Sequence, residues 1–170
     1  MYFFTSDEHY GHYNIIRYCN RPFNSVEEMN EELIKRNNEI VKPNDIVIHG
    51  GDASLRDRKY LEEIIKRLNG QHFFIRGSHD KWMDRSYHEM WCKTINSQHI
   101  VVCHYAMLVW PRSHYNSILL FGHSHSGLND MVQGKCHDIG VDNNNFYPIS
   151  EEKIFEIMKN KPDNFNFIRK

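Results

Sequence analysis

The sequence predicts an α/β fold built on two sheets. In the first half of the chain, expected strands and helices alternate, a pattern typical of parallel βαβ units. In the second half, expected strands follow one another through loops with no long helical pattern between them, which indicates a second sheet. With 170 residues, of which 40% are hydrophobic, the chain suits a single domain over residues 1–170.

Periodicity and turn residues place the elements of the first half. Ser25 and Glu28 have the spacing of a capping box, which opens a helix that runs to about Ile40. A second helix is expected over 57–68, because its apolar residues fall on one face and Asn-Gly follows as a stop signal. Short apolar runs before turn residues predict three strands, at 1–7, 46–49 and 72–76.

The second half carries the strands of the second sheet and a last helix. Ser150, followed by two glutamates, caps a helix that ends before Pro162. The tail, 163–170, contains three large apolar residues and is a candidate edge strand. The three strands expected before that helix cover 99–103, 118–122 and 136–141.

The net charge and the cysteine pattern narrow the kinds of ligand and the cellular location that we expect. A formal net charge of -1 and a pI near 6.9 give no overall basic field for long duplex nucleic acid, whereas a small phosphorylated ligand needs only a local cationic site. The cysteines form no Cys-x-x-Cys pair, no signal-peptide pattern opens the sequence and no apolar stretch could span a bilayer, so we expect a cytoplasmic protein with reduced thiols. The four cysteines are Cys19, Cys92, Cys103 and Cys136.

Residues typical of metal ligands follow most of the expected strands. Taken alone, the Gly-Asp pair at Asp52 is ordinary turn chemistry, whereas His123 and His125 can aim at one metal or at two adjacent metals. Because ligands gather at the carboxyl ends of strands in an open α/β sheet, we expect these residues to meet at one rim. In chain order they are Asp7, His9, Asp52, Ser78, His79, Asp80, His104, His123 and His125.

The order of these motifs resembles the calcineurin-like metallophosphoesterases, in the pattern of a small single-domain prokaryotic or phage-type member. That family shows Asp-x-His, Gly-Asp, Gly-Asn-His-Asp, an isolated His and Gly-His-x-His, and the resemblance here runs from residue 5 to 125. Amidohydrolase-type enzymes place their His-x-His on the first strand, whereas here it comes last. The resemblance implies a two-sheet β-sandwich flanked by helices, the αββα arrangement.

The resemblance also implies a role for each residue. His79 would protonate the leaving oxygen or stabilise its charge, and Asp80 would orient His79. The cofactors would be two divalent metal ions, with manganese expected first and iron, zinc or nickel as alternatives. One metal would be held by Asp7, His9, Asp52 and His125, and the other by Asp52, Ser78, His104 and His123, so that Asp52 bridges the pair.

Ser78 departs from the family pattern. The family has an asparagine there, whose side-chain carbonyl reaches the second metal. A serine hydroxyl is shorter and is a weaker neutral donor, so we expect lower occupancy of the second site and reduced activity. Two explanations of Ser78 stay open. It is either a natural variant that tolerates serine or a substitution made to slow the enzyme.

Residues that would contact the substrate are less sharply marked. Arg112 follows the His104 strand in a segment of aromatic and cationic residues, and we expect it to clamp a phosphate. His12 either faces the substrate or completes a turn. Arg17, Arg21 and His114 are more simply interpreted as solvated loop charges, His49 as a buried hydrogen-bonded histidine, and 142–145 as a turn.

The sequence therefore predicts a dinuclear metal-dependent phosphoesterase. The expected substrate is a small phosphodiester or phosphomonoester, for which a nucleotide is one candidate. Two alternatives stay open: an exonuclease acting on single-stranded ends, and a non-catalytic interaction scaffold on the same fold, as in the retromer subunit that resembles these enzymes. A homo-oligomer is also compatible with the sequence.

Overall fold

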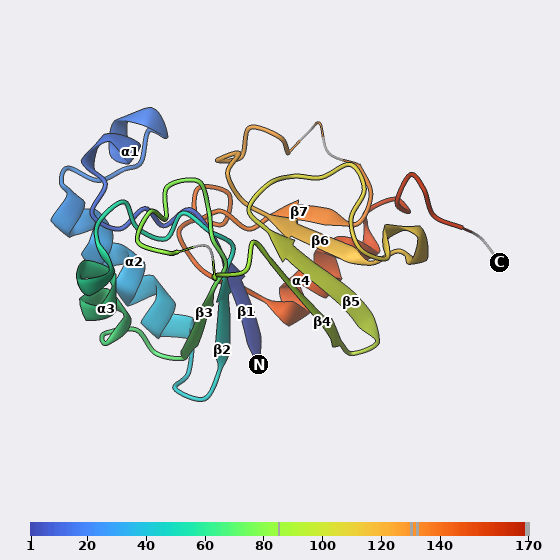
Figure 1. Cartoon of the computed structure of the whole chain (residues 1–170), viewed down its shortest axis with the longest axis horizontal. Helices are drawn as coiled ribbons and strands as arrows, with labels where there is room; N and C mark the ends of the chain where they lie inside the picture. Colours follow the sequence, from blue (N-terminus) through green and yellow to red (C-terminus); the bar gives the residue numbers. More distant parts are fainter. Residues whose placement is uncertain (85, 130, 132, 169–170) are drawn as a thin grey trace.

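Two four-stranded sheets lie side by side at the centre of the computed structural model (Figure 1). The structure describes residues 1–84, 86–129, 131 and 133–168. The first sheet has the order β3-β2-β1-β8 and the second has the order β4-β5-β6-β7. Together with the flanking helices they make an α/β fold with two mixed sheets, as the sequence predicted.

The first sheet is built mainly from the alternating elements of the first half. β1 (Tyr2–Thr5), β2 (Ile46–His49) and β3 (Gln71–Phe74) run parallel, in a register that aligns their carboxyl ends. β8 (Ile149–Ser150) pairs antiparallel with β1 and was not predicted. Its two residues directly precede a helix, so they are too few to give a strand pattern.

Three helices lie at the left of Figure 1: the first in chain order is above, and the other two lie beside the first sheet. They are α1 (Tyr13–Tyr18), α2 (Val26–Ile40) and α3 (Arg58–Ile65). The predicted cap of α2 is confirmed, because the Glu28 amide donates to the Ser25 hydroxyl over 3.0 Å. α1 was not predicted, since six residues with a single buried apolar side chain, Ile15, give no readable periodicity.

The second sheet contains one hairpin and two parallel crossovers. β4 (Met90–Ile95) pairs antiparallel with β5 (Gln98–Cys103), and β5, β6 (Ile118–Phe121) and β7 (Cys136–Asp138) run parallel. β4 was not predicted, because most of its side chains are exposed or half-buried. The candidate edge strand in the tail is wrong for its described part, since 163–168 form no strand, and 169–170 lie outside the described residues.

The largest core cluster joins both sheets to the last helix. Phe4 and Ile48 of the first sheet share it with Val102 and Leu120 of the second and with Ile154 of α4 (Glu151–Lys159), all with at most 1% exposure. Burying such side chains supplies the main driving force for the fold. Within the described ranges, no helix is long and apolar enough to cross a membrane.

Candidate metal centre

Loops at the carboxyl ends of strands from both sheets meet above the core. The amide of Asp7, after β1, donates to the carbonyl of Gly51, after β2, over 3.0 Å, and Gly122, after β6, donates to the carbonyl of His104 over 3.1 Å. Gly122 permits this approach, because a Cβ there would lie 2.1 Å from the Ser6 hydroxyl and 2.3 Å from an Asp7 carboxylate oxygen. The predicted rim therefore exists.

The first group of metal-type ligands is formed by Asp7, His9 and His125, with one ligand atom of each within 4.8 Å of the others. Asp7 Oδ1 and His9 Nε2 are buried and have no hydrogen-bond partner among the described residues. Burial raises the pKa of Asp7 to about 7 and lowers the pKa of His9 to about 2. A neutral imidazole beside a desolvated carboxylate fits a divalent cation, which would satisfy both unpartnered atoms.

The second group consists of Asp52, His104 and His123, whose ligand atoms satisfy the same spacing. His104 Nε2 lies 3.2 Å from Asp52 Oδ2 and 3.2 Å from His123 Nδ1. The other ring nitrogen of His104, Nδ1, lies 3.0 Å from the Gly50 carbonyl, which fixes the ring and leaves Nε2 for a ligand. Burial opposes the charged imidazolium, but the Asp52 carboxylate raises the pKa of His104.

Asp52 lies where the two groups adjoin. Its Oδ2 atom is 3.8 Å from His9 Nε2 in the first group and 3.2 Å from His104 Nε2 in the second. The Ser78 hydroxyl donates to the same oxygen over 3.0 Å, and the His79 amide donates to Oδ1 over 2.7 Å. One carboxylate thus contacts both clusters, and Ser78 stands at the second cluster as its sequence position implied.

The ligand loops hold a backbone conformation that residues other than glycine adopt infrequently. Five of the expected ligands have positive φ angles: Asp7 at 59°, His9 at 54°, Asp52 at 55°, His123 at 66° and His125 at 45°. Such residues cost roughly 1–3 kcal/mol each and persist where surrounding contacts over-determine them. Here each of these residues lies in a loop, two to four residues beyond the end of a strand.

A buried arginine supports the first group, and no sequence motif predicted this role. The Arg21 side chain is fully buried and forms two hydrogen bonds, of 2.7 and 2.8 Å, with Asp142, which lies 2.7 Å from His125 Nδ1. Arg21 also donates to the main-chain carbonyls of Asp7 and Glu8. The interpretation of Arg21 as a solvated charge was therefore wrong, and Asp142 is more than a turn residue, since it orients His125.

Asp80 organises loops rather than pairing with His79, which corrects the prediction. One of its oxygens accepts from the amides of Asp52 and Gly77 at 2.7 and 2.9 Å. The other accepts from the indole of Trp82 at 3.1 Å and from two further amides after Asp52. Because both oxygens are engaged this way, Asp80 acts on the site by fixing the loop that presents Asp52.

His79 and His12 border the first group. His79 is exposed, and its ring centroid lies 5.4 Å from that of His9. His12 is half-buried, with Nδ1 3.3 Å from His9 Nδ1 and its ring centroid 6.2 Å from that of His79. Both imidazoles therefore lie within reach of a ligand bound at the rim.

Arg112 lies at the opposite end of the second sheet, so its predicted contact with the substrate is wrong. It lines a surface pocket with Gln98 and His99, where β5 begins, and with Ser117, just before β6. A six-residue strand spans roughly 20 Å, which separates Arg112 from the ligand His104 beyond the end of β5. The reason is topological: β5 and β6 are parallel, so the chain between them must return to the start of the sheet.

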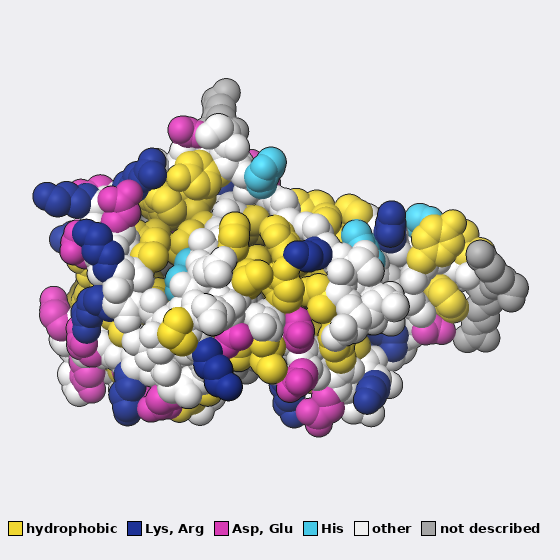
Figure 2. Space-filling view, turned by 90° about the horizontal axis from the view of Figure 1, so that it is seen from below, with side chains coloured by type: hydrophobic (Ala, Val, Ile, Leu, Met, Phe, Trp, Pro, Cys, Tyr) yellow, Lys and Arg dark blue, Asp and Glu magenta, His cyan; other side chains and the backbone are white. Residues whose placement is uncertain are grey.

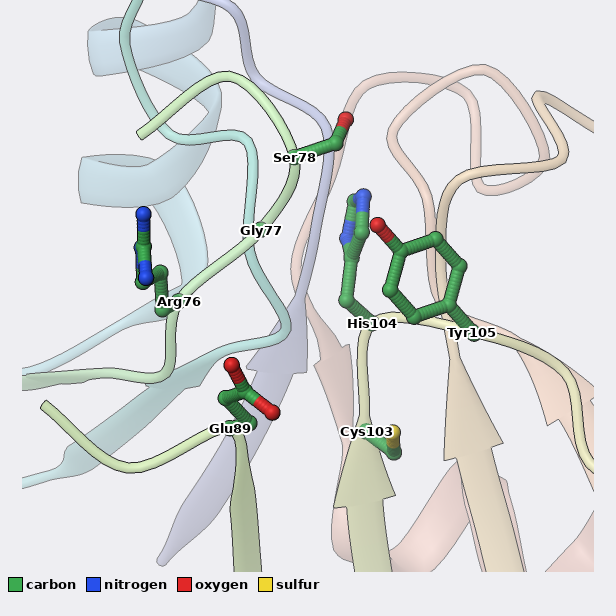
Figure 3. Close-up of a pocket in the computed structure, with 7 residues that line it drawn as sticks. All are labelled: Arg76, Gly77, Ser78, Glu89, Cys103, His104 and Tyr105. Atoms are coloured by element: carbon green, nitrogen blue, oxygen red, sulfur yellow. The ribbon is translucent and has the colours of Figure 1, made fainter. Parts of the chain in front are cut away.

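A pocket of about 280 Å³ adjoins the second group (Figure 3). Ser78, His104 and Tyr105 line one part of it, and their polar atoms point toward a shared space in Figure 3. Arg76 and Glu89 line the other part. Two of the expected ligands, Ser78 and His104, are thus open to a cavity large enough for part of a small molecule.

Comparison with known proteins gives partial matches. No family model matches the chain. It is 50% identical over 82 residues to the uncharacterized protein MJ1445 of Methanocaldococcus jannaschii, and this match covers 47% of each chain. The chain thus aligns with about half the length of that relative.

One solved structure shares the fold of this chain, and two others match it more weakly. The protein of unknown function AQ665 from Aquifex aeolicus superposes with a TM-score of 0.71 at 24% identity, over 92% of this chain and 98% of its own. A predicted phosphoesterase from Streptococcus pneumoniae matches with a TM-score of 0.39 at 21% identity, over 73% of this chain and 62% of its own. Vps29 of Entamoeba histolytica, complexed with zinc, matches with a TM-score of 0.43 at 15% identity, over 73% and 64%.

Proposed function

We propose that this chain is a dinuclear metal-dependent phosphoesterase that hydrolyses a small phosphodiester or phosphomonoester. One observation carries the proposal: two His/Asp groups, each able to hold a metal ion, adjoin at the Asp52 carboxylate. Two adjacent divalent cations supply what phosphoester hydrolysis needs, because they neutralise the anionic oxygens and lower the pKa of a bound water. Asp7, His9 and His125 would hold one ion, and His104 and His123 the other, with Asp52 shared.

The mixed carboxylate and imidazole donors support manganese as the first metal to test, with iron, zinc and nickel as alternatives. His79 is the proposed proton donor to the leaving oxygen, because its exposed imidazole borders the first group. Asp80 holds the Asp52 loop by the hydrogen bonds described above and is a positioning residue.

We propose that Ser78 weakens metal binding at the second site. Its hydroxyl reaches Asp52 but is shorter than the amide side chain of the family asparagine. His104 and His123 would be the imidazole ligands of the second ion, and Ser78 would contribute little. We expect lower occupancy of the second site than of the first. Extending the side chain in Ser78→Asn should restore the missing oxygen ligand.

The size of the pocket and the surface charge support a small substrate. Figure 2, which views the face opposite the rim, shows acidic and basic side chains interleaved along the helical side, and the formal net charge of -1 gives no overall excess of positive charge for a basic track. Long duplex nucleic acid is bound chiefly through such tracks, so we propose a nucleotide or a similar small ester as the substrate and a cytoplasmic setting for the reaction. An exonuclease acting on single-stranded ends is the alternative, and salt-dependent affinity for oligonucleotides would indicate it.

The test is hydrolysis of bis-p-nitrophenyl phosphate and p-nitrophenyl phosphate with added manganese. We expect turnover by the unmodified chain, higher turnover by Ser78→Asn, and a loss of at least a hundredfold in Asp52→Asn, since the shared ligand serves both ions. Arg112→Met, distant from the rim, is the matched control and should retain full activity. Absence of turnover in both the unmodified chain and Ser78→Asn with manganese, nickel or zinc would contradict the proposal and favour the interaction scaffold.

A further inference from the structure

The pocket beside the second group contains a cation and an anion that the proposed hydrolysis does not use. Arg76 follows β3 and stands two residues before Ser78, while Glu89 precedes β4. Both line the cavity that Ser78 and His104 also line. Figure 3 shows Arg76 and Glu89 on one side and the polar atoms of Ser78 and His104 on the other. The pocket is therefore continuous with the second group of ligands.

The Arg76 guanidinium makes no hydrogen bond to the residues that the structure describes. Its Nε atom is buried and has no hydrogen-bond partner among the described residues, and the guanidinium forms no ion pair with any of them. Its main chain is held in place, because the Arg76 amide donates to the His88 carbonyl over 2.9 Å. A buried N–H without an acceptor is costly. A phosphate in the pocket would give the terminal N–H groups of Arg76 an acceptor, since the planar guanidinium presents paired N–H groups that match phosphate oxygens.

Glu89 places an exposed negative charge in the same pocket. Its carboxylate lines the same cavity and makes neither an ion pair nor a hydrogen bond with any residue that the structure describes. A carboxylate can only accept hydrogen bonds, so it suits the hydroxyl groups of a sugar and repels a nearby anion. A ligand that places an anion on Arg76 and hydroxyl groups toward Glu89 satisfies both side chains.

Tyr105 closes the pocket at its metal-facing end. Its ring centroid lies 4.9 Å from that of His104 and 4.8 Å from that of His123, although 47% of the residue is exposed. The ring is thus held against the second group while its hydroxyl faces the shared space in Figure 3. In Figure 3, Tyr105 lies on the side of His104 away from Arg76.

We propose that the pocket binds a second phosphoryl group of the substrate, with Arg76 as its anion-binding residue. The substrate class is then a nucleotide with two phosphoryl groups, one at the metal centre and the other at Arg76, joined through a sugar with a free hydroxyl group that faces Glu89. This inference rests on the proposed function, because it takes the metal centre as the place of the ester. Arg76 would then select substrates that carry a second phosphoryl group.

The test compares the binding of two matched ligands to the full chain loaded with manganese. Adenosine 3′,5′-bisphosphate and adenosine 5′-monophosphate differ by one phosphoryl group and both keep a free 2′-hydroxyl, and calorimetry gives both dissociation constants. We expect the bisphosphate to bind roughly tenfold more tightly, as one charge-assisted contact would give. Arg76→Met should abolish this preference, Arg76→Lys should keep part of it, and Glu89→Gln should increase it by removing a repelling charge.

Arg112→Met is the matched control, since it removes an arginine at the far end of the sheet and should leave the preference unchanged. Equal affinity for the two ligands in the unmodified chain, failure of both to bind, or a preference that survives Arg76→Met would overturn the inference. Hydrolysis of bis-p-nitrophenyl phosphate, which has one phosphoryl group, tests the proposed function separately. Turnover without a bisphosphate preference would leave the phosphoesterase standing, and a preference without turnover would leave only the binding pocket.

Discussion

At the scale of single residues, the buried carboxylate of Asp7 destabilises the metal-free fold, and a bound cation would offset this destabilisation. The residue has no exposed surface, one of its carboxylate oxygens has no partner among the described residues, and burial raises its pKa to about 7. In the absence of metal, ionisation of Asp7 at pH 8 therefore works against folding. A shift of about three units corresponds to roughly 4 kcal/mol as an upper bound.

We predict that Asp7→Asn stabilises the metal-free protein and prevents its stabilisation by metal. In EDTA at pH 8, the variant should unfold at a higher temperature than the unmodified chain, because the buried negative charge is gone. With manganese the order should reverse, since only the unmodified chain gains binding free energy. Differential scanning fluorimetry measures both, and a variant less stable than the unmodified chain in EDTA would contradict this account.

Asp142 is expected to tune the first metal site without touching a metal. Its carboxylate lies between Arg21 and His125 Nδ1, so Asp142→Asn removes the charge that orients the imidazole. Loss of such a supporting partner typically costs 10–100-fold in metal affinity. Manganese titration by calorimetry should show that loss at the tighter site, whereas Glu63→Gln, which removes a charge from the exposed face of α3, should match the unmodified chain. Equal affinities for Asp142→Asn and the unmodified chain would refute the supporting role.

The same residues show where sequence reasoning reached its limit. The ligands could be predicted because each follows a strand in a recognisable motif, and the structure brings the expected ligands together. Arg21 and Asp142 could not be predicted, since they are separated by 121 positions and become a buried pair only when two loops meet. Asp80 was assigned to His79 because the two are neighbours in sequence, yet the folded loop turns its carboxylate toward backbone amides.

At the scale of elements, long and periodic segments were predictable and short ones were not. α2, α3 and α4 carry caps and a buried stripe, and all three lie close to their predicted positions. β8 and α1 are too short to show a period, and the mostly exposed β4 lacks the apolar alternation of a half-buried strand. The misplacement of Arg112 was avoidable, because two consecutive parallel strands force the connecting chain back to the start of the sheet.

The pairing of β2 with β3 predicts a pH-dependent stability. His49 was correctly interpreted as buried and hydrogen-bonded, and its Nε2 lies 2.8 Å from Nδ1 of His72 across the strand pair. Burial, with His49 nearby, lowers the pKa of His72 to about 3. The unfolded chain therefore takes up a proton near pH 6.5 that the folded chain refuses, so stability is complete above that pH and falls as the pH drops toward 3.

Urea unfolding in EDTA between pH 7 and pH 5 measures this effect. The free energy of unfolding should decrease on acidification, with His72 contributing at most about 1.4 kcal/mol per pH unit. His72→Asn lacks the titrating group and should show a shallower decrease than the unmodified chain. A variant with the same slope as the unmodified chain would mean that His72 does not take part.

At the scale of the whole molecule, the candidate metal centre joins the two sheets. Asp7, His9 and Asp52 come from loops after β1 and β2 of the first sheet, whereas His104 and His123 follow β5 and β6 of the second. The shared core cluster fixes the sheets relative to each other, and the ligand loops meet where the carboxyl ends converge. Two metals bound around Asp52 would thus cross-link the sheets at the rim as well as supply the chemistry.

The most direct test of this account is anomalous diffraction from crystals of the full chain grown with manganese. We predict two anomalous peaks, separated by about 3.5–4 Å as in dinuclear sites, one on each side of the Asp52 carboxylate. The peak beside His104 and His123 should be the weaker one and should strengthen in Ser78→Asn. A single peak, or peaks that do not flank Asp52, would contradict the dinuclear centre on which the proposed hydrolysis depends.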